Sequence, residues 1–225
     1  MKVTTDSCLF GAWTAMQLKQ RPTREKKLLD IGTGTGLLSL MVAQENPEIN
    51  IDALEIDSDA AAQAVENVDA TSWKERINIF KGDVRTIHLP GKYDYIISNP
   101  PFYQNELASL NQLRNSAHHG TDLSLDELFP LIKLHLVDNG RFFLLLPYKR
   151  SRLIQELPGK YDLSVEHMVL VKQSVQHGYF RIMLSGYIGK QPGQEIRIDE
   201  LAITAEQGDY TREFRNLLQA YYLHL

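Results

Sequence analysis

The stretch LLDIGTGTGLLSL, at positions 28–40, decides the fold. An apolar run that only Asp30 interrupts leads into closely spaced glycines, and an apolar-periodic segment follows them. This order predicts a buried strand, a tight turn and the start of a helix. Glycine lets the backbone turn sharply and approach a ligand, because it has no Cβ atom. The glycines of this turn are Gly32, Gly34 and Gly36.

The spacing of these glycines indicates the kind of ligand. G-x-G-x-G differs from the G-x-G-x-x-G turn that shapes a pyrophosphate site at a helix N-terminus. It suits a ligand whose nucleoside and amino-acid parts cross the strand end without a diphosphate. A glycine-rich turn alone is weak evidence, so the rest of the chain must decide.

The composition is that of an ordinary soluble globular protein. The chain has 225 residues, of which 43% are hydrophobic and 23% charged. We expect one α/β domain, with a helix and a basic connection at 1–27, a ligand-binding core at 28–157 and a hairpin plus helix at 158–225. The only cysteine, Cys8, excludes an internal disulfide and a cysteine-based zinc cluster. The net charge of −4 neither indicates nor excludes nucleic-acid binding.

The N-terminus MKVTTDSCLFGAW lacks the apolar core of a signal peptide. No apolar run approaches the ~20 residues that span a bilayer. We therefore expect a cytoplasmic protein.

Strands and helices alternate along most of the chain. The sequence predicts strands at 27–31, 49–56, 77–83, 93–99 and 141–147, and helices at 4–18, 37–45, 59–71, 125–136 and 148–157. The strands at 164–172 and 179–188 have no helix between them and should pair as a hairpin, and a helix is expected over 211–225. This pattern predicts an α/β fold with a doubly wound, mostly parallel seven-stranded sheet and an antiparallel hairpin at one edge.

Two of these segments carry further expectations. The first helix should be amphipathic, with Leu9, Ala12, Trp13 and Met16 facing inward. Residues 104–122 are polar, and we expect a mobile segment that faces the substrate.

Polar residues end the predicted strands at the edge where a doubly wound sheet binds its ligand. Glu55 lies 19 residues after Gly36, near the spacing at which an acid reaches a ribose, although it could be a surface acid. Asp83 could accept a bond from an adenine amine, with Val84 offering its backbone amide, or it could cap a turn. Asp30 needs a partner if it is buried, and we expect it to hold the glycine turn in shape.

The most specific element is Asn99-Pro100-Pro101-Phe102 at the end of the fourth strand. Such a turn suits methyl transfer to a planar amine, whose lone pair is delocalised. The Asn99 oxygen and the Pro100 carbonyl can accept the two N–H groups and stabilise the charge that grows on the nitrogen. Pro101 keeps the turn rigid, and Phe102 offers a face for stacking a base. A sulfonium methyl donor needs no metal and no strong base.

The motifs DIGTGTG, LEID, GD and NPPF, in this order, resemble a class I S-adenosylmethionine-dependent methyltransferase of the amino-methylating group. MKVTTDSCLFGAW, RNSAHHGTDLSLDELF and YTREFRNLLQAYYL closely resemble the bacterial tRNA1(Val) adenine-N6 methyltransferase family. The resemblance covers nearly the whole chain. It implies methylation of an anticodon-loop adenine at the N-P-P-F turn, and it places Thr5 and Asp6 near the methionine end of the cofactor.

Together these arguments predict two sets of site residues and no metal. The catalytic set is Asn99, Pro100, Pro101 and Phe102. The set that binds S-adenosylmethionine is Thr5, Asp6, Asp30, Gly32, Gly34, Gly36, Glu55, Ile56, Asp83, Val84 and Asn99.

The chain departs from the family pattern in one respect. Family members usually begin with an aromatic and basic segment before MKV, so we expect either a trimmed start or the absence of a substrate-contacting piece. Tyr103, where guanine-N2 rRNA methyltransferases have histidine, separates the chain from that group.

The expected partner is tRNA, and no obligate protein partner is indicated. Basic residues could form a phosphate track that makes binding salt-dependent. They are Lys19, Arg21, Arg24, Lys26, Lys27, Arg114, His118, His119, Lys149, Arg150 and Arg152. Two alternatives stay open: a glutamine-N5 methyltransferase acting on a protein such as a release factor, and a non-catalytic S-adenosylmethionine-binding RNA chaperone.

Overall fold

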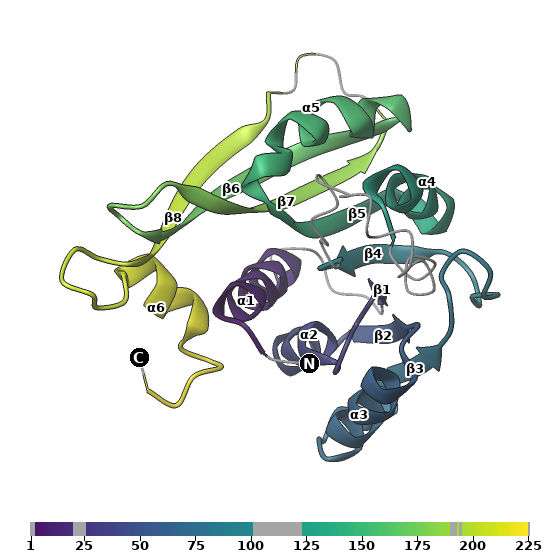
Figure 1. Cartoon of the computed structure of the whole chain (residues 1–225). Helices are drawn as coiled ribbons and strands as arrows, with labels where there is room; N and C mark the ends of the chain where they lie inside the picture. Colours follow the sequence, from purple (N-terminus) through teal and green to yellow (C-terminus); the bar gives the residue numbers. More distant parts are fainter. Residues whose placement is uncertain (1–2, 20–25, 101–122, 190–192, 194, 225) are drawn as a thin grey trace, which may run out of the picture.

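The computed structural model describes residues 3–19, 26–100, 123–189, 193 and 195–224 (Figure 1). In this part of the chain one sheet of eight strands runs in the order β3-β2-β1-β4-β5-β7-β6-β8. The strands are β1 (Lys26–Ile31), β2 (Ile49–Glu55), β3 (Ile77–Lys81), β4 (Tyr93–Ser98), β5 (Leu136–Pro147), β6 (Leu163–Ser174), β7 (Tyr179–Ile188) and β8 (Arg197–Thr204). The first five are parallel to one another, and β7 runs antiparallel to both β5 and β6.

Helices cover both faces of this sheet (Figure 1). They are α1 (Thr5–Lys19), α2 (Leu37–Glu45), α3 (Ser58–Asp69), α4 (Leu125–His135), α5 (Ser151–Lys160) and α6 (Arg212–Leu218), with short 3-10 turns η1 (Lys74–Arg76) and η3 (Tyr148–Arg150). Buried side chains of α1, α2 and α6 form one core cluster with one face of the sheet. Those of α4 and α5 form a second cluster with the opposite face. The predicted doubly wound α/β fold is confirmed.

Local signals in the sequence account for the helix starts. The Asp57 side chain caps α3 by accepting a hydrogen bond from the Ala60 amide at 2.8 Å. Ser124 and Glu127 form a reciprocal capping box at the start of α4, as expected for a serine followed by an acid at the third helical position. Both helices therefore begin within a residue of the predicted position.

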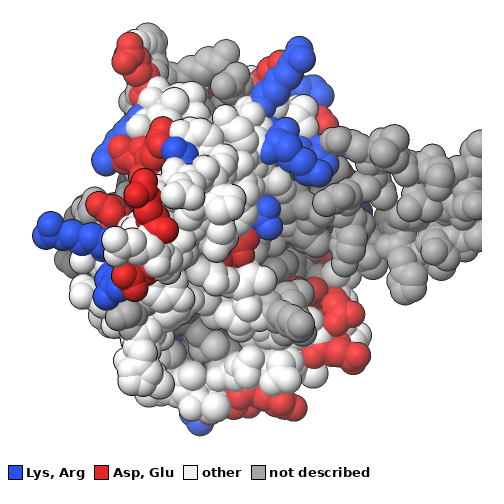
Figure 2. All heavy atoms as spheres, turned by 60° about the vertical axis from the view of Figure 1, so that its left-hand side comes forward, with Lys and Arg blue, Asp and Glu red and all other residues white. Residues whose placement is uncertain are grey.

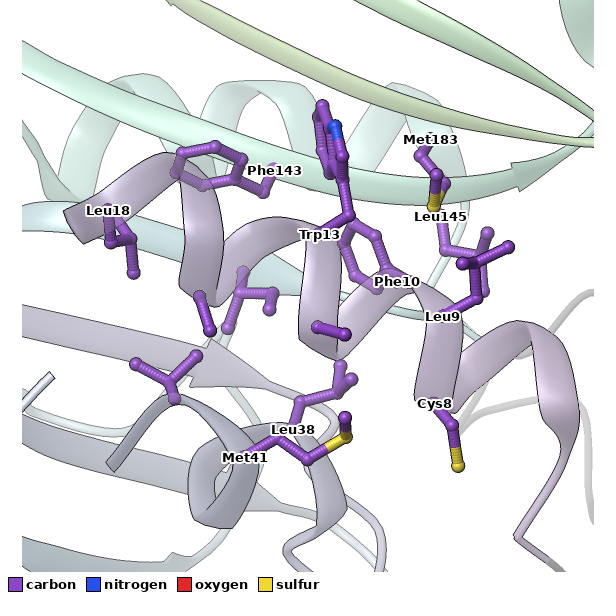
Figure 3. Packing of buried hydrophobic residues seen from close by; sticks show 14 of the residues in the cluster. Cys8, Leu9, Phe10, Trp13, Leu18, Leu38, Met41, Phe143, Leu145 and Met183 are labelled. Atoms are coloured by element: carbon purple, nitrogen blue, oxygen red, sulfur yellow. The ribbon is translucent and has the colours of Figure 1, made fainter. Parts of the chain in front are cut away.

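Helix α1 is buried on almost every side, so the predicted amphipathic helix is wrong in this respect. Trp13 packs edge-on against Phe143 of β5 with ring centroids 5.9 Å apart, while Leu38 and Met41 of α2 lie on the other side (Figure 3). Met16, expected to face inward, is 37% exposed. Helix α1 packs against α2, α6 and β5, and this arrangement leaves it no broad solvent face.

A glycine lies where α1 approaches α2. A Cβ atom on Gly11 would lie 2.6 Å from the Met41 sulfur, which is closer than real Cβ atoms come to a neighbour. A side chain at this position would require the end of the Met41 side chain to shift.

The C-terminal third holds two differences from the sequence prediction. The sheet has eight strands rather than seven, because β8 pairs in parallel with β6 and takes the edge that the hairpin was expected to occupy. The charged residues Arg197, Asp199 and Glu200 interrupt its apolar residues, so the sequence analysis did not predict this strand. Helix α6 ends at Leu218, so Tyr221 and Tyr222 pack against the core from beyond the helix rather than within it.

The fifth strand is also longer than predicted. Helix α4 ends at His135 and β5 begins at Leu136, so the Asn139-Gly140 pair lies inside a strand rather than ending the helix. The register of β5 against β4 shifts between Tyr93 and Tyr95, and this irregularity accommodates the extra residues.

Candidate active site

The glycine turn connects β1 to α2 through a left-handed backbone. Gly32, Gly34 and Gly36 have φ angles of +74°, +60° and +86°, a region that residues with a Cβ rarely adopt. The amides of Gly32 and Thr33 donate to the Leu54 carbonyl at 2.9 and 3.0 Å, which ties the turn to the end of β2. Each of these glycines therefore occupies a position whose backbone conformation favours glycine.

Asp30 holds the turn from behind. Its side chain is fully buried, and one carboxylate oxygen accepts hydrogen bonds from the hydroxyls of Thr33 at 2.6 Å and Ser39 at 2.7 Å. Burial raises the pKa of Asp30 to about 6, although the two hydroxyls oppose the shift. The expected partners are thus present, and Asp30 does not line the cleft described below.

Glu55 ends β2 and reaches back to the same turn. Its carboxylate accepts a hydrogen bond from the Gly34 amide at 2.8 Å on one oxygen and from the Asp57 amide at 2.9 Å on the other. The residue is only 7% exposed, yet it lines the cleft. Each oxygen retains a lone pair, so the carboxylate is positioned by backbone amides and is able to accept bonds from a ligand diol.

Asp83, after β3, is engaged by an arginine that the sequence analysis missed. The Arg85 guanidinium contacts both oxygens of Asp83 at 2.6 to 2.9 Å and reaches Glu127 of α4 at 3.1 Å. These hydrogen bonds lower the pKa of the Asp83 carboxyl. Asp83 also accepts from the Arg85 amide at 2.9 Å and therefore caps its turn, and its role toward an adenine stays a prediction.

The turn predicted to be catalytic begins at the end of β4. Asn99 and Pro100 line the cleft, whereas Pro101 and Phe102 lie outside the described residues. The Asn99 amide nitrogen donates to the Ser7 hydroxyl of α1 at 2.9 Å. The first turn of α1 therefore contacts Asn99.

A second contact from the same turn of α1 reaches β7. The Arg181 Nε donates to the Asp6 carboxylate at 2.7 Å, and both residues line the cleft. Thr5, predicted beside Asp6, is exposed and does not line the cleft. Ser7 and Arg181 were missed, although Ser7 belongs to the N-terminal motif that was recognised as characteristic.

These elements enclose one cleft of about 1100 Å³ at the carboxyl edge of the parallel strands. Of the predicted cofactor residues, the cleft brings together Asp6, Gly32, Glu55, Ile56, Asp83, Val84 and Asn99. Gly34 and Gly36 shape its wall without lining it. Carboxylates outnumber cations in this lining, and Arg85 and Arg181 are each paired with an acid, so the cleft favours a cationic ligand.

Comparisons with known proteins place the chain in a family. Residues 13–122 match the model of the Methyltransferase small domain family. A tRNA1(Val) (adenine(37)-N6)-methyltransferase from Proteus mirabilis is 35% identical over 100% of this chain and 88% of its own length. The enzyme of the same name from Dyadobacter fermentans is 36% identical over 99% of this chain and 91% of its own length.

The chain belongs to the tRNA1(Val) (adenine(37)-N6)-methyltransferase family.

Solved structures of more distant methyltransferases share the fold of this family member. A predicted O-methyltransferase from Agrobacterium tumefaciens superposes with a TM-score of 0.70 at 15% identity, with 95% of each chain covered. The glycopeptide N-methyltransferase MtfA in complex with S-adenosylmethionine gives a TM-score of 0.57 at 12% identity, covering 80% of this chain and 88% of that one. At these identities the likeness extends to the fold alone.

The basic residues predicted to meet RNA are only partly available in this member of the family. Lys19 pairs with Glu45, Lys26 with Asp94 and Arg152 with Glu156, whereas Lys149 is exposed. Arg21, Arg24, Arg114, His118 and His119 lie outside the described residues. On the face in Figure 2 basic and acidic side chains are interspersed. The phosphate track therefore stays a prediction.

Membrane-spanning helices and metal-ligand clusters are both absent from the residues that the structure describes. None of the helices there combines the length and the apolar character that crossing a bilayer requires. Within the same residues, no three histidine, cysteine or acidic side chains gather as metal ligands would.

Proposed function

We propose that the chain transfers a methyl group from S-adenosylmethionine to the exocyclic N6 amine of an adenine in a tRNA anticodon loop, with tRNA1(Val) as the substrate. The named relatives support this substrate, since they match almost the whole chain. The observation that carries the chemistry is the placement of Asn99 and Pro100 on the same cleft as Glu55 and the glycine turn. We further infer that the chain forms one domain, because α1 and α6 share a core cluster, and that it acts in the cytoplasm, because its named relatives modify tRNA.

The residues of the cleft fit the cofactor. Glu55, held by two backbone amides, would accept from the ribose hydroxyls, and the left-handed glycine turn lets the amino-acid part pass close to the backbone. The excess of carboxylates favours a molecule that carries a sulfonium and an ammonium group. S-adenosylmethionine supplies an already activated methyl group, so the protein has to position the acceptor and stabilise its charge.

Asn99 and Pro100 supply that stabilisation. The Asn99 amide nitrogen is used on Ser7, so its oxygen is the atom that would accept one N–H of the adenine amine. The Pro100 carbonyl would accept the other. Both bonds strengthen as positive charge develops on the nitrogen, so they lower the barrier more than they stabilise the bound substrate. The proton leaves to solvent after transfer.

The test is a methyl-transfer assay with labelled S-adenosylmethionine, total tRNA from a strain that lacks its own enzyme, and a release factor as the competing substrate. We expect label in N6-methyladenosine of tRNA, identified by nucleoside mass spectrometry. Label in the release factor would instead assign the chain to glutamine methylation. Bound cofactor with no label in either would favour a non-catalytic module.

A variant separates catalysis from binding in the same assay. Asn99→Ala should lower kcat roughly 100-fold or more, as the loss of a transition-state hydrogen bond does elsewhere, while the Kd for the cofactor stays within a few-fold. If Kd rises as much as kcat falls, Asn99 serves cofactor binding rather than the transition state.

A further inference from the structure

Asn99, which we propose to be catalytic, has a hydrogen-bond partner on α1. Ser7 stands in the first turn of α1, and its hydroxyl accepts the Asn99 amide nitrogen at 2.9 Å. The same hydroxyl lies 2.8 Å from that of Thr4. When the Ser7 proton is donated to Thr4, the Ser7 oxygen remains an acceptor for Asn99.

The direction of this hydrogen bond matters for the reaction. A carboxamide presents an acceptor on one side and two donors on the other. Rotation by half a turn would aim the amide nitrogen of Asn99 at the substrate, where a donor would meet the N–H of the adenine amine. Because Ser7 holds the nitrogen, the oxygen of Asn99 is left for the amine.

Ser7 is itself held from two sides. Its backbone amide donates to the Asp6 carboxylate at 3.1 Å, and the other oxygen of Asp6 accepts from Arg181 of β7 at 2.7 Å. Behind this turn, Leu9 and Phe10 of α1 are fully buried in the core. The Ser7 hydroxyl is therefore presented to Asn99 from a fixed backbone.

We propose that Ser7 is the positioning residue of the active site, which holds the Asn99 carboxamide with its oxygen toward the amine that is methylated. This inference rests on the proposed function, since it assigns a role within the same reaction. Ser7 acts through Asn99, so its loss should lower kcat and leave the KM for S-adenosylmethionine unchanged.

The sharpest test compares two variants of equal shape. Ser7→Thr keeps the hydroxyl, whereas Ser7→Val replaces it by a methyl group. We expect Ser7→Thr to retain kcat within about 3-fold and Ser7→Val to lose about 10-fold or more, with KM for the cofactor within 2-fold in both. Ser7→Ala, which removes the hydroxyl without adding a methyl group, should lose as much kcat as Ser7→Val. This control excludes an effect of the added methyl group.

Thr14→Val is the matched control on the same helix. The Thr14 hydroxyl is buried and has no hydrogen-bond partner within the described part of the chain, so its removal should not change kcat. Melting temperatures of all variants, measured with and without cofactor, report whether any loss of rate comes from unfolding.

Two results would overturn the proposal. Equal kcat values for Ser7→Thr and Ser7→Val would show that the hydroxyl has no role. A loss of kcat from Ser7→Val that is just as large in an Asn99→Ala background would show that Ser7 does not act through Asn99. An active wild type in these experiments leaves the proposed function standing, whereas a wild type that methylates no adenine overturns both.

Discussion

The wild-type carboxylate of Glu55 satisfies two backbone N–H groups, those of Gly34 and Asp57, and glutamine cannot do so. In Glu55→Gln one oxygen becomes an NH₂ group, which must face one of these donors. A buried N–H left without an acceptor costs about 1–3 kcal/mol, and we expect the free energy of unfolding to fall by this amount.

The same change removes the charged acceptor proposed for the ribose. A hydrogen bond to a charged group contributes about 1.5–3 kcal/mol, which corresponds to roughly a 10- to 150-fold change in Kd. We therefore expect the Kd for S-adenosylhomocysteine, measured by isothermal titration calorimetry, to rise by at least about 10-fold in Glu55→Gln.

The control for this experiment is Asp59→Asn. Asp59 lines the same cleft but is exposed, and no hydrogen bond joins its side chain to the glycine turn among the described residues. Asp59→Asn loses the same charge, but from an exposed position where solvent and salt screen it, so the Kd for S-adenosylhomocysteine should change by less than about 3-fold. A Glu55→Gln variant that binds within 3-fold of the wild type would refute the ribose assignment, and an unchanged free energy of unfolding would refute the argument from donor geometry.

Three further substitutions test the shape of the site and of the sheet. Burial raises the pKa of Asp30 to about 6, so the folded state binds more protons than the unfolded state between about pH 4 and pH 6. As the pH rises through that window, the ionisation of Asp30 should therefore lower the free energy of unfolding by about 3 kcal/mol. Denaturant titrations of Asp30→Asn should not show this decrease. Gly36→Ala places a Cβ at a φ of +86° and should cost about 1–2 kcal/mol, measured by urea denaturation, whereas an unchanged midpoint would show that the turn relaxes freely. In Gly186→Ala the new Cβ would lie 2.3 Å from the Phe142 ring, and we expect a loss of about 3 kcal/mol or more, visible as a lower melting temperature or insoluble protein.

The site residues that lie at or directly after the ends of strands could be predicted from the sequence. Asn99, Glu55 and the glycine turn come immediately after apolar runs, and the carboxyl ends of parallel strands meet at one edge of a sheet. Short-range patterns in the sequence were sufficient to place them together. The structure confirms that they line or shape one cleft.

Residues that join the site from distant elements were not predictable in this way. Arg181 lies at the start of β7, 175 positions after its partner Asp6, and no local pattern relates the two. The partnership of Arg85 with Glu127 likewise depends on how α4 packs. Such contacts follow from tertiary structure, which a single sequence does not reveal by periodicity.

The errors in the fold have related causes. Helix α1 was expected to be amphipathic, with one apolar face directed inward and the other face in solvent. Instead, α2 and the sheet cover it. Strand β8 was missed because Arg197, Asp199 and Glu200 interrupt its apolar residues, as is common for an edge strand.

The burial of α1 has a consequence for how the protein is made. Its core cluster includes Phe214 and Leu218 of α6, so the packing around α1 is completed by residues that lie far later in the sequence. The glycine turn and the strands around it can pair earlier, since they are neighbours in sequence. We therefore expect the packing around α1, the helix that carries Ser7, to be completed only after α6 has been synthesised.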